Sequence, residues 1–176
     1  MFKPFAAAAL AAALATPAAA QAHHDNGPLA DLVPLQKMYF GWAIQAAEQM
    51  DEADYGFKPT PDVRSFGQLA GHMANANFAF CATAKGEKSP ATANYEKVAT
   101  KAEIVAGMKA AEKYCLSAYE GLSHERAETT VDLFGQKGTV NWVLAWNAVH
   151  NGEHYGNMVT YFRLKGKVPP SSQGGN

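Results

Sequence analysis

The chain has 176 residues, of which 48% are hydrophobic and 18% charged, and its formal net charge is −1. Acidic and basic residues are interspersed, which excludes the strongly basic surface by which proteins bind nucleic acid or anionic membranes, so we expect neither partner. The length suits a single domain with its own hydrophobic core.

Residues 1–22 have the pattern of a cleaved secretory signal peptide. Lys3 supplies the positive charge, an uncharged alanine-rich run follows, and small residues precede a polar segment. The run is shorter than the ~20 residues that span a bilayer, so an uncleaved anchor is the less favoured alternative. Cleavage after Ala20 and after Ala22 both fit. We therefore expect a periplasmic or secreted protein whose mature chain has no membrane attachment and starts with a flexible tail at residues 23–30.

Apolar residues then recur with the period of an amphipathic helix in four segments. The first segment is residues 31 to about 50, and the second runs from residue 65 to a polar connector that starts at residue 85. The third is residues 101 to about 119, and the fourth is residues 139–165. Strands are not predicted, apart from short pairing around Val131. The sequence therefore predicts an all-α four-helix bundle over residues 31–170, followed by a flexible tail at residues 171–176.

Capping residues support these helix boundaries. Ser65 with Gln68 forms a Ser-x-x-Gln capping box at the start of the second helix. Thr139 is a favourable N-cap for the last helix, and Gly166 ends it ahead of two prolines.

The lengths of the connectors constrain the order of the helices. The 16 residues 85–100 can stretch about 50 Å, enough to run back along a helix of about 27–30 Å, so the second and third helices can be parallel. Cys81 and Cys115 would then lie at the same end of the bundle and could form a disulfide, as an exported protein allows. In an up-down-up-down bundle they would lie at opposite ends, too far apart to bridge. We predict the crossover arrangement.

The last helix carries His150 and His154, whose spacing puts both imidazoles on one helix face. Polar residues on a core-facing stripe are costly without partners, and a metal ion is the leading candidate. His-x-x-x-His also occurs by chance, and a lone His72 on the second helix would more often be a hydrogen-bonded boundary residue. In antiparallel helices, however, the three imidazoles can converge and leave a divalent ion an open position, as in catalytic zinc sites.

The letters HNGEH also match the inverted metallopeptidase pattern H-x-x-E-H, in which Glu153 would be the general base. No acidic residue follows Glu153 to serve as the third ligand of such an enzyme, so this interpretation is disfavoured. Glu153 stays a weak candidate for a catalytic base beside the histidines. Asn75, Asn147 and Asn157 are candidates for contacts to the ligands.

Two longer stretches carry a resemblance to a known family: FKPTPDVRSFGQLAGHMANAN and HNGEHYGNMVTYFRLKGKVPP. They resemble the Pro-rich turn with its first histidine, and the closing helix with its paired histidines, of the DinB-like four-helix bundle family, which is related to YfiT-type bacterial thiol transferases. The resemblance implies an up-down-down-up bundle. It also implies a three-histidine site for zinc, nickel or a similar ion at His72, His150 and His154, and a homodimer. Gly152 and Gly156 offer a small-residue surface for such a dimer, and close packing within the bundle explains these glycines equally well.

The expected function is therefore a metal-dependent enzyme that activates water or a thiol toward a small-molecule substrate, as a hydrolase or a thiol transferase. The alternative is a non-enzymatic bundle that binds a metal or another ligand. A third interpretation is that the histidines are an inherited remnant in a structural bundle.

Overall fold

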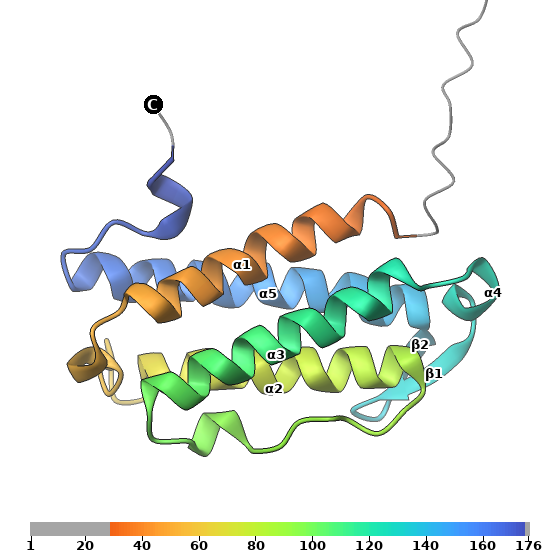
Figure 1. Cartoon of the computed structure of the whole chain (residues 1–176), viewed down its shortest axis with the longest axis horizontal. Helices are drawn as coiled ribbons and strands as arrows, with labels where there is room; N and C mark the ends of the chain where they lie inside the picture. The colour runs from red at the N-terminus through yellow and green to blue at the C-terminus, as the bar shows by residue number, and fades with distance from the viewer. Residues whose placement is uncertain (1–28, 175–176) are drawn as a thin grey trace, which may run out of the picture.

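The computed structural model describes residues 29–174, and four long helices make up most of them (Figure 1). They are α1 (Leu32–Gln49), α2 (Phe66–Lys85), α3 (Lys101–Glu120) and α5 (Val140–Leu164). The predicted all-α bundle is confirmed. The shorter elements are η1 (Glu52–Asp54), η2 (Tyr95–Lys97), α4 (His124–Ala127), β1 (Thr130–Leu133), β2 (Gln136–Thr139) and η3 (Pro170–Ser172).

The helices begin where the capping residues predict. The Ser65 hydroxyl accepts a hydrogen bond from the backbone N–H of Gln68, and the Gln68 side chain accepts one from the Ser65 N–H, which completes the capping box at α2. Thr139 caps α5 by accepting from the N–H of Trp142. None of the helices in the described part of the chain has the length and apolarity to cross a membrane.

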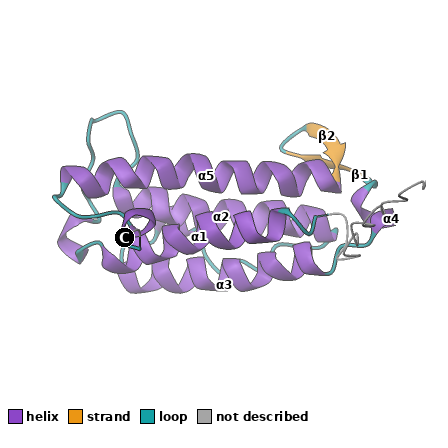
Figure 2. Ribbon diagram, turned by 90° about the horizontal axis from the view of Figure 1, so that it is seen from above, coloured by secondary structure: helices purple, strands orange, loops and turns teal. Residues whose placement is uncertain are grey.

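The four long helices run up, down, down and up. Gln36 and Trp42 follow one another along α1, and they contact Asn151 and Tyr155 in the same order along α5, so α1 and α5 are parallel. Figures 1 and 2 show α2 and α3 side by side. Each of α1 and α2 packs against both α3 and α5, whereas α1 and α2 lie diagonally opposite and contact each other little.

A disulfide joins Cys81 near the end of α2 to Cys115 near the end of α3, with 5.2 Å between their Cα atoms. Both cysteines are fully buried. Because the bridge joins corresponding ends of the two helices, α2 and α3 are parallel, as the long connector predicts.

The centre of the bundle contains a network of buried amides as well as apolar side chains. Gln36, Asn77, Asn147 and Asn151 are each at most 1% exposed. Asn77 Oδ1 accepts from Gln36 at 2.9 Å and from Asn151 at 3.0 Å, and Asn147 Nδ2 lies 3.1 Å from the same oxygen. Tyr119 donates to the Leu144 carbonyl at 2.6 Å beside them. Most of these polar groups satisfy one another, which makes their burial tolerable, and Asn147 Oδ1 is the member that has no partner among the described residues.

The connector before α5 contains a β-hairpin, where the sequence predicts only short pairing around Val131. β1 pairs antiparallel with β2 from Thr130 opposite Thr139 to Leu133 opposite Gln136. Phe134 and Gly135 form the turn with φ of 55° and 81°. Such a turn normally takes Asn-Gly or Asp-Gly, so Phe-Gly is a weak hairpin signature. Figure 2 shows the hairpin at the end of the bundle where α5 begins.

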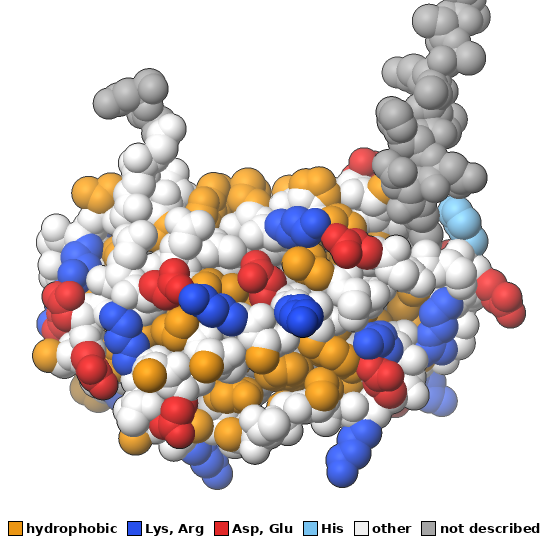
Figure 3. All heavy atoms as spheres, in the orientation of Figure 1, with side chains coloured by type: hydrophobic (Ala, Val, Ile, Leu, Met, Phe, Trp, Pro, Cys, Tyr) orange, Lys and Arg blue, Asp and Glu red, His pale blue; other side chains and the backbone are white. Residues whose placement is uncertain are grey.

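The ends of the chain differ in part from expectation. The flexible C-terminal tail was expected from residue 171, but Ser171 donates to the Tyr155 hydroxyl at 2.8 Å and Gln173 to Gln49 at 2.7 Å, so the ordered domain extends to residue 173. The predicted signal peptide (1–22) and most of the N-terminal tail (23–30) lie outside the described residues. Acidic and basic side chains are interspersed over the face seen in Figure 3.

Candidate metal centre

Three imidazoles meet between α2 and α5. His72 lies in the first half of α2, and His150 and His154 lie one turn apart on the antiparallel α5. Nε2 of His150 is 3.3 Å from Nε2 of His72 and 3.0 Å from Nε2 of His154. One ligand atom from each of the three residues lies within 4.8 Å of the others. The structure thus brings all three predicted ligands together.

The spacing of these nitrogens fits a divalent metal ion. Nitrogens that coordinate zinc tetrahedrally at about 2.1 Å lie about 3.4 Å from one another, close to the measured separations. Nδ1 of His150 is buried and has no hydrogen-bond partner among the described residues. An ion bound at Nε2 of His150 would place the ring proton on Nδ1 and leave that atom unpartnered, so the support for a metal comes from the spacing of the facing nitrogens. In residues 29–174 the cluster has three members, so a fourth position is left to solvent or substrate.

The three imidazoles are held neutral, as metal ligation requires. Burial is the main cause that lowers the pKa of His150 to about 3, and the charges of His154, His72 and Arg64 contribute to the same lowering. Burial is also the main cause of the lowered pKa values of His72 and His154. The positive charge of Arg64 contributes to the lowering at each of the three.

Glu96 is a functional candidate that the sequence did not reveal. Its Oε2 lies 3.4 Å from Nδ1 of His72, on the side of the ring away from the other imidazoles, and its Oε1 accepts from Nε of Arg64 at 2.9 Å. Burial alone would raise the pKa of Glu96, but Arg64 and His72 outweigh it and the pKa is lowered. A carboxylate in this position fixes the ring of a metal-bound histidine and makes it a better ligand.

Polar side chains named from the sequence take different positions around the cluster. The Asn157 amide lies 3.4 Å from Nδ1 of His154, where its oxygen can accept the ring proton after a 180° rotation of the amide. Asn75 bonds to Asn94 at 2.7 Å and accepts from the Tyr95 N–H at 3.0 Å, so it anchors the turn that presents Glu96.

Asn147, in contrast, is part of the buried amide network, and its Nδ2 lies 3.3 Å from the Cys115 sulfur. Glu153 is exposed and makes no hydrogen bond to an imidazole within the described residues. Its charge raises the pKa values of His72 and His154 against the effect of burial. The structure therefore gives Glu153 an electrostatic influence but no contact that a catalytic base requires.

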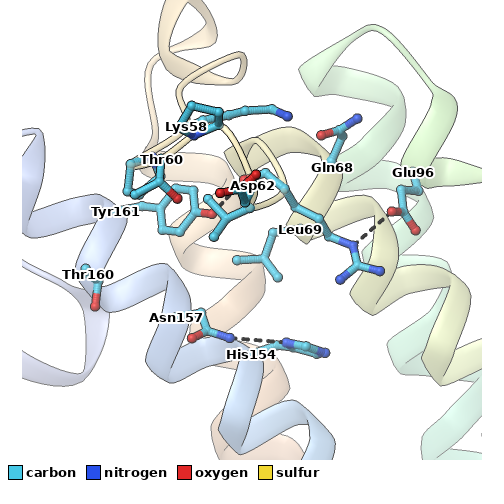
Figure 4. Close-up of a pocket in the computed structure, with 14 residues that line it drawn as sticks. Lys58, Thr60, Asp62, Gln68, Leu69, Glu96, His154, Asn157, Thr160 and Tyr161 are labelled. Atoms are coloured by element: carbon cyan, nitrogen blue, oxygen red, sulfur yellow. Dashed lines mark hydrogen bonds and ion pairs between the residues drawn. The ribbon is translucent and has the colours of Figure 1, made fainter.

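A pocket of about 710 Å³ opens beside His154, between the loop before α2 and the end of α5. Figure 4 shows Glu96 and Gln68 across the pocket from His154 and Asn157, with Leu69 between them. Its size suits a small molecule. The polar residues that line it include Lys58, Asp62, Arg64, Gln68, Asn157 and Tyr161.

Comparisons with known proteins agree with this fold. The family model described as the DinB superfamily matches residues 43–158, a stretch that contains all three histidines. Among curated proteins no sequence matches the chain at a significant level.

Solved structures of low sequence identity share the fold. A DinB-like protein from Bacillus subtilis is 21% identical, with a TM-score of 0.66 over 82% of this chain and 99% of that one. A DinB-like protein from Bacillus cereus is 16% identical, with a TM-score of 0.69 over 79% of this chain and 93% of that one.

Proposed function

The chain belongs to the DinB superfamily, and on that premise we propose that it binds a divalent metal ion, zinc or nickel, through His72, His150 and His154. We propose further that it is a metal-dependent enzyme that activates water or a thiol toward a small-molecule substrate, as a hydrolase or a thiol transferase. The observation that carries this proposal is the convergence of three neutral imidazoles, within 4.8 Å, beside a pocket of about 710 Å³.

The residues around the cluster would each have a limited role. When bound, the ion supplies a Lewis acid that lowers the pKa of a water or thiol in its open position. Glu96 orients His72 through Nδ1, and the Asn157 amide orients His154. The pocket holds the substrate next to the open position.

A non-enzymatic metal- or ligand-binding protein is the second candidate. The exposure of Glu153 favours it, because within residues 29–174 this carboxylate makes no hydrogen bond to an imidazole of the cluster. A screen of ester, amide and thiol-transfer substrates with the metal-loaded protein separates the two candidates, since only the enzyme turns over.

We also propose that the mature protein is periplasmic or secreted. The leader-like residues 1–22 support this, and so does the Cys81–Cys115 disulfide, because disulfides persist in oxidising compartments. A homodimer is proposed through the α5 surface at Gly156, where an added Cβ would meet nothing within 4 Å, whereas Gly152 packs against the Tyr39 ring within the bundle. Mass measurement of the exported protein and its elution volume on size exclusion test these two points.

Metal analysis of the purified protein tests the central proposal. We expect close to one equivalent of a divalent metal in the wild type and a large loss in His150→Ala. His124→Ala is the matched control, because His124 is exposed on α4, outside the cluster. Equal metal content in the wild type and His150→Ala would refute the site.

A further inference from the structure

Arg64 has an unusual position for a cation, because it lies beside the site proposed for a metal. It precedes the N-cap of α2, and its backbone carbonyl accepts from the Tyr161 hydroxyl at 2.6 Å. Its side chain lines the pocket with 43% of its surface exposed. Its charge reaches all three imidazoles. A guanidinium in this place repels a metal ion unless something negative lies between them.

Glu96 provides only part of that compensation. It accepts from Nε of Arg64 at 2.9 Å, and within residues 29–174 the two terminal nitrogens of Arg64 make no hydrogen bond to protein. Those nitrogens carry four N–H donors in a planar fork that matches a carboxylate. The side chain is therefore held at one nitrogen and leaves the others available to a ligand.

The charges that line the pocket leave an excess of positive charge once an ion is bound. Lys58 and Arg64 are balanced by Asp62 and Glu96. The three neutral imidazoles do not neutralise a divalent ion, so its two charges are left for the ligand to compensate. Such a site attracts anions and raises their local concentration.

The remaining lining suits the carbon skeleton of such a ligand. Leu69 and Val63 offer apolar surface in the pocket, and Gln68 and Thr160 offer neutral hydrogen-bonding groups. A small molecule with a metal-binding group at one end and an anionic group at the other therefore matches the pocket.

We propose that Arg64 binds the carboxylate of the substrate, so that this site selects small carboxylate-bearing molecules whose other end reaches the metal. This inference rests on the proposed metal site and gives it a substrate class. Arg64 acts by holding the substrate and takes no part in bond making.

Binding of two thiols to the Co²⁺-loaded protein tests the inference. The probes are 3-mercaptopropionate and the neutral 2-mercaptoethanol, and the readout is the near-ultraviolet band of the thiolate bound to cobalt, which needs no turnover. In Arg64→Gln we expect the affinity for 3-mercaptopropionate to fall about tenfold and that for 2-mercaptoethanol to change less than twofold. Arg163→Gln, which removes an exposed arginine outside the pocket, should change neither. Arg64→Lys keeps the charge but lacks the planar fork, so it should lose less carboxylate affinity than Arg64→Gln and retain part of it.

The outcomes separate this inference from the proposed function. Failure of the wild type to bind Co²⁺ at the histidines would overturn both. Normal Co²⁺ binding with equal losses for the two thiols in Arg64→Gln, or with no loss for either, would overturn the role of Arg64 alone. If Arg64→Gln loses cobalt itself, Arg64→Lys decides: retained cobalt with a retained carboxylate affinity supports the inference, and retained cobalt without it overturns it.

Discussion

Replacing Glu96 by glutamine removes the negative charge that faces His72 while it keeps the length of the side chain. We expect the protein to bind Zn²⁺ about tenfold more weakly as a result, a loss of about 1.4 kcal/mol. Glu96→Ala should lose more, because the amide oxygen of glutamine can still accept the Nδ1 proton and alanine offers no acceptor at all.

The structure places the expected effect at the low end of the usual range. Partners of metal-bound histidines are typically worth ten- to a hundredfold in metal affinity. The 3.4 Å between Glu96 Oε2 and His72 Nδ1 is longer than an ordinary N–H···O bond of about 2.9 Å. The carboxylate side chain is also 31% exposed, so water screens its charge.

Competition with a chromophoric zinc chelator at pH 7.5 measures the affinity. Glu125→Gln is the matched control, because Glu125 is an exposed acid on α4 away from the cluster. Wild-type affinity in both Glu96→Gln and Glu96→Ala would refute the argument that the carboxylate orients the ligand. A loss of similar size in Glu125→Gln would show that only the net charge matters.

Three further results are expected. Gly71→Ala should destabilise the protein by about 1–3 kcal/mol and weaken metal binding, because the added Cβ would collide with the carbonyl of Tyr95 next to Glu96. Gly56→Ala, with open space around its Cβ, is the control in urea unfolding and metal titration. Asn77→Ala should cost about 2–4 kcal/mol in urea unfolding, since its buried amide partners lose their acceptor; an unchanged midpoint would contradict this. The metal-free protein should lose stability as the pH falls from about 6.5 toward 3. In the folded protein the pKa of His150 is lowered to about 3, chiefly by burial, so over this range the imidazole takes up a proton in the unfolded chain and stays neutral in the folded one. Urea midpoints that stay constant from pH 7 to 4.5 would disprove this.

The helices and their order were predictable because local signals agree with the global arrangement. The Ser65 and Thr139 caps define where α2 and α5 begin, and the connector at 85–100 is long enough for the crossover that makes α2 and α3 parallel. The histidine cluster follows from these two facts, because antiparallel α2 and α5 put His72 at the height of His150.

The residues that the sequence did not reveal depend on partners far away in the chain. Glu96 lies in a connector without helical period, and only the packing of η2 against α2 brings it to His72. By their polarity, Asn77 and Asn151 look like surface residues. Burying an amide costs free energy unless it has a hydrogen-bond partner, and a single sequence does not show that these two side chains are partners. Phe134 tolerates its positive φ beside Phe80, with which it makes an edge-on aromatic contact at 6.0 Å.

The disulfide of this bundle and the proposed metal site both involve the same helix. The disulfide fastens the C-terminal part of α2 to α3, and an ion at His72, His150 and His154 would fasten its N-terminal part to α5. Only α1 is then held by side-chain packing, hydrogen bonds and ion pairs alone. Helix α1 can therefore separate locally from the bundle without breaking the disulfide or the proposed metal coordination. The positions of the three histidines would not change during such an opening. Local opening and loss of the metal thereby become separate events in this fold.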